Sequence, residues 1–542
     1  MATGFLPRRG AVMGTQRQGG THPFSYPAPA GGINAVDPLA NLDTTYSVLA
    51  NNLIPDGRGL RVRSGYQKFA TNVGAGEVRT VIPFQGATAA TDKLFVAGPA
   101  GIYDISAGGA GAWATSIAFG TTTGNAGYGV YTDYVLDNSS HYVFYADEVN
   151  GLYQYPSGGP WVSSVGLITG PAGGAASIAF IMQHKGRIWM IERDSARAWY
   201  LPTGAVAGAA TRFDFGNKFK HGGTLVGLWN WTVDGGIGVD DHLVALSSSG
   251  DVIVYKGNDP SSAATWSVVG QYYIGAIPAG RRQAQSFGGE LFLLSQYGLL
   301  PMSRLISGAP VQENDIYASA KISPLVSTEM AASRTSFGWE VRNIPSENVF
   351  VINTPKRTGL TYKQFAMSTK TNGWCIFNDL EYITGDVWQG TFYIGGAGGN
   401  VYRMTGNSDA VSLTGTGGNA VSFSLITAFS DLGDPGRFHR VQFLRPVFRA
   451  SAAPSYSIAA RYDYNTDDYT GIAIPVTITG ALWDAAAALW DTALWGGDAA
   501  TIQSVTAGSG IGRAVAAVLL GTSTGETNLI RIDLMADTGG ML

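Results

Sequence analysis

Three short segments of the chain carry residue types at spacings that could support catalysis or ion binding. The first is GTSTG, Gly521–Gly525, which matches the G-x-S-x-G pattern around a nucleophilic serine. That pattern requires a strand before Ser523 and a helix after it, so that the hydroxyl sits on a strained turn. The residues that follow, ETNLIRIDLM, alternate as a strand does, so a plain turn is the favoured interpretation.

The second segment is DYNTDDYTG, in which Asp463, Asn465 and Asp467 have the spacing of oxygen ligands in a calcium loop. The sixth position of that loop holds Asp468 in place of glycine. The twelfth position holds Ile474 in place of a bidentate glutamate. Because Asn and Asp favour turns, a hairpin turn is the better interpretation, and the three residues are kept as a calcium candidate.

The third segment, STKTNGW at Ser368–Trp374, has a faint similarity to the Ser-x-Asp-x-Gly-x-x-Trp turn of sialidase-like propeller hydrolases. The aspartate is missing and the spacing from glycine to tryptophan differs. Glycosidases also need two carboxyl groups that flank the bond, and a sequence cannot show two distant carboxyl groups converging. A polysaccharide hydrolase therefore stays open as an alternative, but no motif lies in its required context, and we predict that the protein is not an enzyme.

Motifs for metals and cofactors are absent from the sequence. Cys375 is the single cysteine, which excludes an internal disulfide and a cysteine-based zinc site. The six histidines show no H-E-x-x-H or other metal spacing. We expect no cofactor and, apart from the calcium candidate, no bound metal.

The composition limits the classes of protein to which the chain can belong. Charged residues make up 14% of the chain, against roughly 25% in typical soluble domains, and the 74 glycines are about twice the usual share. The net charge of −4 and the lack of a basic stripe argue against a protein that grips DNA tightly. No signal peptide and no membrane-spanning run of about 20 apolar residues is present, so we expect synthesis in a cytosol.

One pattern repeats along the middle of the chain: an apolar strand, a turn that usually carries Gly or Asn, and a strand that holds an aromatic residue. The repeats start 43 to 58 residues apart, which is the period of propeller blades of about four strands each. We predict an all-β fold with a β-propeller of six to eight blades. The alternative is a chance series of hairpins in a β-sandwich, although sandwich strands recur at roughly 8–12 residues. The seven repeats start at Lys93, Tyr142, Arg187, His242, Glu290, Asn348 and Thr391.

Two regions fall outside this repeat. Residues 1–75 contain Pro, Gly and Arg without clear periodicity, which predicts an extended N-terminal arm that docks on another surface. Residues 413–542 contain longer alternating strands, which predict a β-sandwich-like platform domain. The propeller is therefore assigned to residues 76–412.

Two groups of residues are candidates for contacts with other subunits. The segment Ala481–Gly497 carries three tryptophans, which predict either a core of the last domain or a partner contact, because Trp is enriched at interface hot spots. Three arginines near the N-terminus are either solvated or pair with acidic groups of a neighbour. The interface candidates are Arg8, Arg9, Arg17, Trp483, Trp490 and Trp495.

Four segments in order resemble a family of tail proteins from short-tailed bacteriophages, the tail nozzle or tail-tube proteins. Gly31–Phe69 is similar to that family's N-terminal "GGlN…DPla" pattern, and Tyr362–Leu380 to its "QFVMNT.TGAW..F" stretch. Phe392–Met404 and Ala428–Phe448 fit as well. The resemblance covers about residues 30–450, and it implies a β-propeller with an added platform domain.

The resemblance also implies a role and a set of partners. Such proteins form a ring, typically six-fold, below the portal and its adaptor, and extend the channel through which duplex DNA leaves without being held. We therefore expect a virion tail protein made in the bacterial cytoplasm that contacts itself as a hexamer, the adaptor or portal ring, and tail fibre, spike or needle proteins. A tail protein that binds a host receptor is a further alternative.

Overall fold

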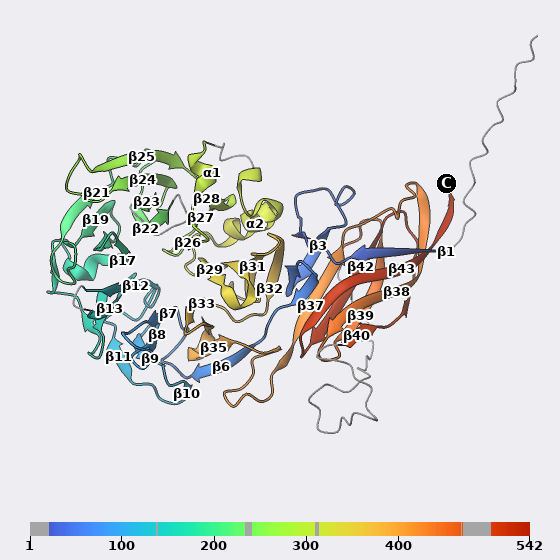
Figure 1. Ribbon diagram of the computed structural model, residues 1–542, viewed down its shortest axis with the longest axis horizontal. Coiled ribbons are helices and arrows are strands. Elements are labelled where there is room, and N and C mark those ends of the chain that lie inside the picture. The colour runs from blue at the N-terminus through green and yellow to red at the C-terminus, as the bar shows by residue number, and fades with distance from the viewer. Residues whose placement is uncertain are drawn as a thin grey trace, which may run out of the picture.

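Strands form almost all of the regular structure of the chain. The computed structural model describes residues 21–136, 139–232, 241–308, 314–467, 469 and 500–541 of the 542 residues. Figure 1 shows a ring of small sheets joined on one side to an elongated stack of longer strands. We refer to these two parts as the propeller and the sandwich.

The propeller begins with four blades, each a four-stranded antiparallel sheet that runs from an inner to an outer strand. Blade 1 contains β7 (Thr80–Phe84), β8 (Lys93–Gly98), β9 (Gly101–Asp104) and β11 (Thr115–Ala118). Blade 2 contains β12 (Gly129–Val135), β13 (His141–Asp147), β14 (Gly151–Pro156) and β15 (Val162–Ser163). Blade 3 contains β17 (Ile178–His184), β18 (Arg187–Glu192), β19 (Arg197–Tyr200) and β21 (Thr211–Asp214). Blade 4 contains β22 (Leu225–Thr232), β23 (Asp241–Ser247), β24 (Asp251–Gly257) and β25 (Trp266–Tyr273).

Three further blades complete the ring. Blade 5 contains β26 (Ala284–Phe287), β27 (Glu290–Ser295) and β28 (Gly298–Pro301), and is followed by the helices α1 (Met302–Ile306) and α2 (Ser323–Ser333). Blade 6 contains β29 (Glu340–Ile344), β30 (Val349–Asn353), β31 (Lys363–Ser368) and β32 (Trp374–Asn378). Blade 7 contains β33 (Thr384–Trp388), β34 (Thr391–Gly395), β35 (Val401–Met404) and β6 (Tyr66–Thr71), with β10 (Gly109–Ala110) beside β6. The short strands β16 (Ile168–Thr169) and β20 (Gly208–Ala209) pair with each other.

The inner strands close into a ring. Each inner strand contacts the inner strand of the next blade, from β7 through β12, β17, β22, β26 and β29 to β33, and β33 contacts β7. The fold is therefore an all-β propeller of seven blades, within the range that the sequence predicted. Each of the seven predicted hairpins forms the second and third strands of one blade.

The N-terminal region does not form a separate arm over its described part. Strand β6 is the outer strand of blade 7, where Tyr66 pairs with Met404 and Ala70 with Val401. This pairing joins the beginning and the end of the propeller. The expectation of an arm from 1–75 thus differs from the structure over residues 21–71, because strands of two to seven residues that pair with distant strands leave no local periodicity.

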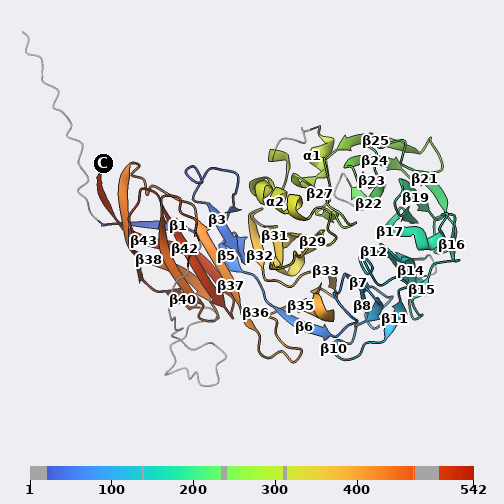
Figure 2. The same ribbon diagram turned by 180° about the vertical axis from the view of Figure 1, so that it is seen from behind.

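The sandwich combines strands from both ends of the chain, as the view from behind in Figure 2 shows. Its first sheet adjoins β32 of blade 6, and its second sheet, called here the terminal sheet, covers the opposite side of a shared core. Phe448 of the terminal sheet packs against Phe423 and Tyr456 of the first sheet. The first sheet contains β2 (Gly32–Ile33), β3 (Tyr46–Asn51), β36 (Ser408–Asp409), β37 (Asn419–Thr427), β39 (Ser455–Tyr462) and β42 (Val515–Ser523). The terminal sheet contains β1 (Thr21–Pro27), β4 (Leu53–Asp56), β5 (Gly59–Val62), β38 (Arg437–Ala450), β40 (Ala500–Gln503), β41 (Thr506–Ala507) and β43 (Thr527–Met541).

Two connecting segments cross between the propeller and the sandwich, and they are locked together. The Arg63 guanidinium donates two hydrogen bonds to Asp409, of 2.7 and 2.6 Å, and its side chain is fully buried. Next to this pair, the Gly65 N–H donates to Gly406 O at 2.9 Å. A Cβ at Gly65 would lie 2.1 Å from Ser408 O, so the two segments approach more closely than any side chain allows.

Gly65→Ala is expected to lower the free energy of unfolding by about 1–3 kcal/mol, because the added methyl forces the two connecting segments apart. Gly57→Ala is the matched control, since a Cβ at that position meets nothing within 4 Å. Urea denaturation of the two variants checks the prediction. Equal stability of both variants would show that the close approach at the junction does not matter.

Within the described residues, no helix has the length and apolar character needed to cross a membrane.

Candidate functional site

The axis of the propeller holds a group of charged side chains contributed by different blades. Arg282, which lies two residues before β26 of blade 5, connects to several other blades. Its Nε donates to Gly129 O of blade 2 at 2.9 Å, and its Nη1 donates to Thr384 Oγ1 of blade 7 at 2.9 Å. Its Nη2 donates to Arg79 O and Thr80 Oγ1 of blade 1, at 2.9 and 2.6 Å. A single side chain therefore ties three other blades to blade 5.

Glu340, at the start of β29 in blade 6, is a buried acid that accepts hydrogen bonds from several groups at the axis. It is 1% exposed and lies 3.3 Å from Arg282 Nη1 and 3.1 Å from Arg342 Nε. The Tyr382 hydroxyl and the Gly385 N–H also donate to it, at 3.2 and 3.3 Å. Burial, together with the Glu340 carboxylate, raises the pKa of Tyr382 well above its ordinary value, so Tyr382 remains a donor.

A second acid, Asp386 of β33, binds the other side of the same arginine. Its Oδ2 lies 3.2 Å from Arg342 Nη2 and accepts a 2.6 Å hydrogen bond from the Tyr131 hydroxyl of blade 2. Burial raises the pKa of Tyr131 well above its ordinary value, and Asp386 adds to this effect. Arg342 thus joins two carboxylates and keeps both of them in ion pairs.

Arg281 crosses the axis beside Arg282. Its Nη2 lies 3.2 Å from Glu148 Oε1 of blade 2, and its Nη1 donates to Val226 O of blade 4 at 2.9 Å. Both arginines line a small cavity of about 20 Å³ and a larger cavity of about 380 Å³. The two side chains therefore contribute to the walls of both cavities.

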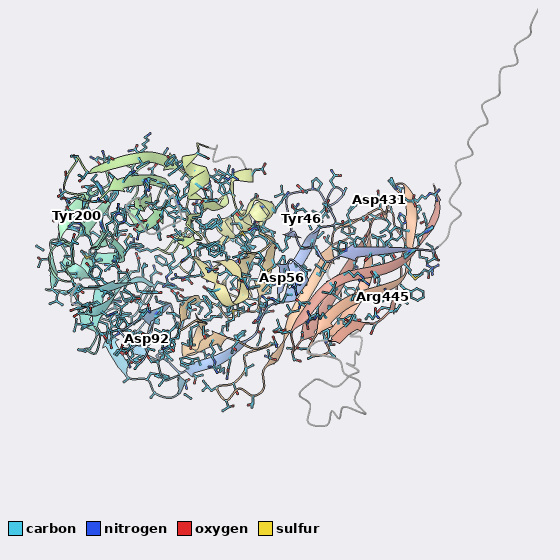
Figure 3. All side chains as sticks on the ribbon, in the orientation of Figure 1. Tyr46, Asp56, Asp92, Tyr200, Asp431 and Arg445 are labelled. Atoms are coloured by element: carbon cyan, nitrogen blue, oxygen red, sulfur yellow. The ribbon has the colours of Figure 1, made fainter. Side chains whose placement is uncertain are left out.

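The larger cavity, called here the axial cavity, contains a carboxyl group with unusual properties. Asp133 of β12 lines it, and the Oδ1 atom of Asp133 is buried without a hydrogen-bond partner in the described part of the chain. Burial, with smaller contributions from the nearby carboxylates of Asp386 and Asp92, raises the pKa of Asp133 to about 7. Asp92, labelled in Figure 3, lies in the loop after β7. A carboxyl group with this pKa titrates near neutral pH, which is typical of functional sites.

A separate surface lies on the sandwich, on an exposed face of the terminal sheet. Pro23 of β1 pairs with Met535 of β43, which pairs with Phe443 of β38, which pairs with Ala507 of β41. These four residues form one row across four strands, called here the apolar row. Phe443 is 45% exposed and Met535 is 41% exposed. Val505 adds to the same surface, which borders a groove of about 720 Å³.

Charged side chains flank the apolar row. In the neighbouring row, Ser25 pairs with Asp533, which pairs with Arg445. Arg445 and Arg531 both form ion pairs with Asp533, of 2.7 and 3.0 Å. Figure 3 places Arg445 on the sandwich, away from the propeller. An apolar centre with a polar rim is the pattern of a protein interface.

The sequence candidates for catalysis are placed apart from the axis. Ser523 is 2% exposed, and its hydroxyl lies 2.7 Å from Thr527 Oγ1 and donates to Gly525 O. Strand β43 follows it in place of a helix, so the hydroxyl is part of a closed turn. Ser368 and Trp374 of the sialidase-like segment are buried at the ends of β31 and β32, where Trp374 Nε1 donates to Ala318 O at 2.9 Å.

The calcium candidate lies after β39. Asp463 Oδ1 accepts the N–H groups of Arg513 and Ala514, at 2.7 and 3.3 Å, and Asn465 Oδ1 accepts the N–H of Asp467 at 2.9 Å. These contacts belong to the turn that connects the strands. Among the described residues, no group of three or more His, Cys, Asp or Glu side chains is arranged to hold a metal ion. A calcium ion at this turn remains an untested prediction.

Cys375 is fully buried, and burial raises the pKa of its thiol well above the ordinary value, so it packs as a small apolar side chain. The interface candidates from the sequence all lie outside the described residues: Arg8, Arg9, Arg17, Trp483, Trp490 and Trp495.

The charged residues of the axis are not predicted by the sequence. The only signals were the adjacent Arg281 and Arg282 before an apolar strand, and the Glu-x-Arg spacing of Glu340 and Arg342 at the start of another. Charged residues at the ends of strands are usually solvated, so neither signal indicated a buried network.

Comparisons with known proteins add little to these observations. No family model and no curated protein matches the chain. Among solved structures, it is similar to YCF48 bound to D1 peptide at 12% identity and a TM-score of 0.34, over 66% of this chain and 98% of that one. It is also similar to the β-propeller domain of Myceliophteria thermophila Cps50 (Swd1) at 11% identity and a TM-score of 0.35, over 62% of this chain and 99% of that one. Similarities at these TM-scores do not support an inference about function. The propeller assignment rests on the strand pairing of this chain.

Proposed function

We propose that the protein is a structural subunit of a short-tailed phage tail, which forms a ring with copies of itself below the portal or adaptor. The observation that carries the proposal is the apolar row on the terminal sheet, which is exposed beside a groove of about 720 Å³. A contiguous exposed apolar surface with a charged rim favours a partner contact. The resemblance of four sequence segments to tail nozzle proteins supports the identity of that partner as a further copy.

The terminal sheet is expected to contact a neighbouring subunit through its exposed face and not through its edge strand. Edge strand β1 carries Pro23 and Pro27, and proline cannot donate a backbone hydrogen bond to an added strand. Subunits are therefore expected to pack side chains of the apolar row against a neighbour, without adding a strand to the sheet. Repetition of such a contact between different surfaces gives a closed ring when the rotation closes.

Three-dimensional averaging of intact tails, with this chain carrying a visible label, tests the role directly. The proposal predicts a ring of identical densities around the tail axis. A single off-axis copy, or scattered copies on the capsid, would refute both the ring and the conduit role. Binding of the isolated protein to host cells would instead favour the receptor-binding alternative, and release of reducing sugar from host polysaccharide would favour the hydrolase.

Phe443→Asp is expected to reduce incorporation of the chain into tails at least tenfold, because a buried unpaired charge at an interface is strongly unfavourable. The fold of the subunit should be unaffected, since this side chain is already about half exposed. The measurement is the amount of the chain in purified particles, with the melting temperature of the free subunit as a check on folding. Leu360→Asp is the control, because Leu360 is 50% exposed on the propeller. Normal incorporation of Phe443→Asp would exclude the apolar row as the contact.

A further inference from the structure

The axial cavity is lined by three arginines and one carboxyl group, that of Asp133. Its volume of about 380 Å³ lies in the range of small-ligand sites, and inner strands of blades 2 to 6 line it. Three arginines are among the lining residues, and each has an acidic partner within 3.3 Å. The pairs are Arg281 with Glu148, Arg282 with Glu340, and Arg342 with Asp386.

Asp133 also lines the cavity, and none of the three arginines forms an ion pair with it. Among the described residues, Asp133 forms no ion pair with a basic side chain, whereas the carboxylates of Asp386 and Asp92 raise its pKa. Asp386 is already bound to Arg342 and Tyr131, and Asp92 accepts a backbone N–H at 2.9 Å. When Asp133 is ionised, it is therefore a partly buried charge without a counterion, which is an unfavourable state unless a cation arrives from outside.

We propose that the axial cavity binds one organic cation, an ammonium or guanidinium group, which pairs with Asp133. The group belongs either to a small free amine or to a Lys or Arg side chain of another protein. This site lies on the propeller axis and does not depend on the ring proposed above.

The other walls of the cavity suit such a group. Trp229 and Tyr131 are half-buried aromatic residues that line it, and aromatic faces attract cations. Asn230 and Gln285 provide amide oxygens, although both oxygens already accept hydrogen bonds, from His184 and Arg342 respectively. Because each arginine of the cavity is paired with an acid, Asp133 is the group that we expect to hold the ligand cation.

Isothermal titration of the full chain at pH 8 tests the proposal. Putrescine is the probe, and 1,4-butanediol is its neutral counterpart of equal chain length. We expect one equivalent of putrescine to bind, the diol to bind at least tenfold more weakly, and Asp133→Asn to weaken putrescine binding at least tenfold. Asp214→Asn is the control, because Asp214 is exposed on the outer strand β21 and should leave binding unchanged.

Two further probes separate the sources of the cation. Acetyl-lysine amide represents a side chain of a partner protein, and acetyl-norleucine amide is its uncharged control. Binding of either cation that depends on Asp133 supports the proposal, and the tighter of the two identifies the source. Equal binding of charged and neutral probes, no binding of either cation, or binding that Asp133→Asn leaves unchanged would overturn it.

The pH dependence gives an independent check. Asp386, Asp92 and Tyr131 lie around Asp133, and Arg342 is held by Asp386. Burial and Asp386 raise the pKa of Tyr131 well above its ordinary value, so Tyr131 stays neutral. Because the ligand cation pairs with the ionised form, lowering the pH from 8 to 6 should weaken binding about tenfold. Binding that strengthens on acidification would contradict the assignment to Asp133.

Discussion

Arg282→Ala is expected to lower the free energy of unfolding by about 3–5 kcal/mol, the cost of removing one partner from a buried charge pair. The reason is the number of blades that lose a connection. The Arg282 guanidinium binds backbone or side-chain oxygens of blades 1, 2 and 7, and it lies 3.3 Å from Glu340 of blade 6. Without it, Glu340 remains buried with Arg342 as its remaining basic partner.

The measurement is equilibrium unfolding in urea, followed by tryptophan fluorescence. Arg197→Ala is the matched control, because Arg197 is exposed and lies 3.8 Å from Glu192, a geometry worth at most about 1 kcal/mol. The double variant Arg282→Ala/Glu340→Ala should lose less than the two single variants combined, since it removes the stranded acid as well. A loss for Arg282→Ala as small as that for Arg197→Ala would show that the axial arginine does not hold the ring together.

The part of the fold that the sequence predicted is the local part. Each blade contains a hairpin such as Lys93–Asp104 or Thr391–Met404, whose two strands are close in sequence and alternate in a recognisable way. The period of these hairpins then gave the propeller, because the whole ring repeats one such unit.

The closure of the ring and the make-up of the sandwich could not be predicted in the same way. Strand β6 pairs with a strand more than 300 residues away, and Tyr26 of β1 donates a hydrogen bond to Val515 O near the other end of the chain. Short strands with distant partners carry no periodicity of their own, so the sequence alone predicts an arm for residues 1–75. Neither composition nor spacing indicates which distant strand accepts them.

The axial site shows the same limit at the level of side chains. Arg282 and Glu340 are 58 residues apart, and Tyr131 and Asp386 are 255 residues apart. The charged residues of the axis come from blades 2, 5, 6 and 7, and no sequence window contains more than a fraction of the network. The propeller geometry alone brings these residues together, so the site becomes visible only once the ring is closed.

The same geometry makes Asp133 a source of instability at neutral pH. The folded protein holds the pKa of Asp133 at about 7, above its ordinary value of 3.8, because burial and the carboxylates of Asp386 and Asp92 disfavour the charged form. A raised carboxyl pKa means that the folded state binds the proton more tightly than the unfolded state. The corresponding stability is fully present below pH 3.8 and is lost as the pH rises from 3.8 to about 7.

Asp133→Asn is therefore expected to stabilise the unliganded protein by about 2–4 kcal/mol at pH 8 and to have little effect at pH 4. The asparagine has nearly the shape of the protonated acid and does not ionise, so it avoids the repulsion by Asp386 and Asp92. Urea denaturation of both proteins at the two pH values checks the expectation, and Asp214→Asn should show no such difference between them. A variant that is equally stable at pH 8, or less stable there, would mean that Asp133 does not hold an uncompensated charge. If Asp133→Asn is more stable at pH 8 and no longer binds putrescine, the Asp133 carboxylate costs stability and is needed for binding. That result would mean that the cavity holds this carboxylate for its ligand.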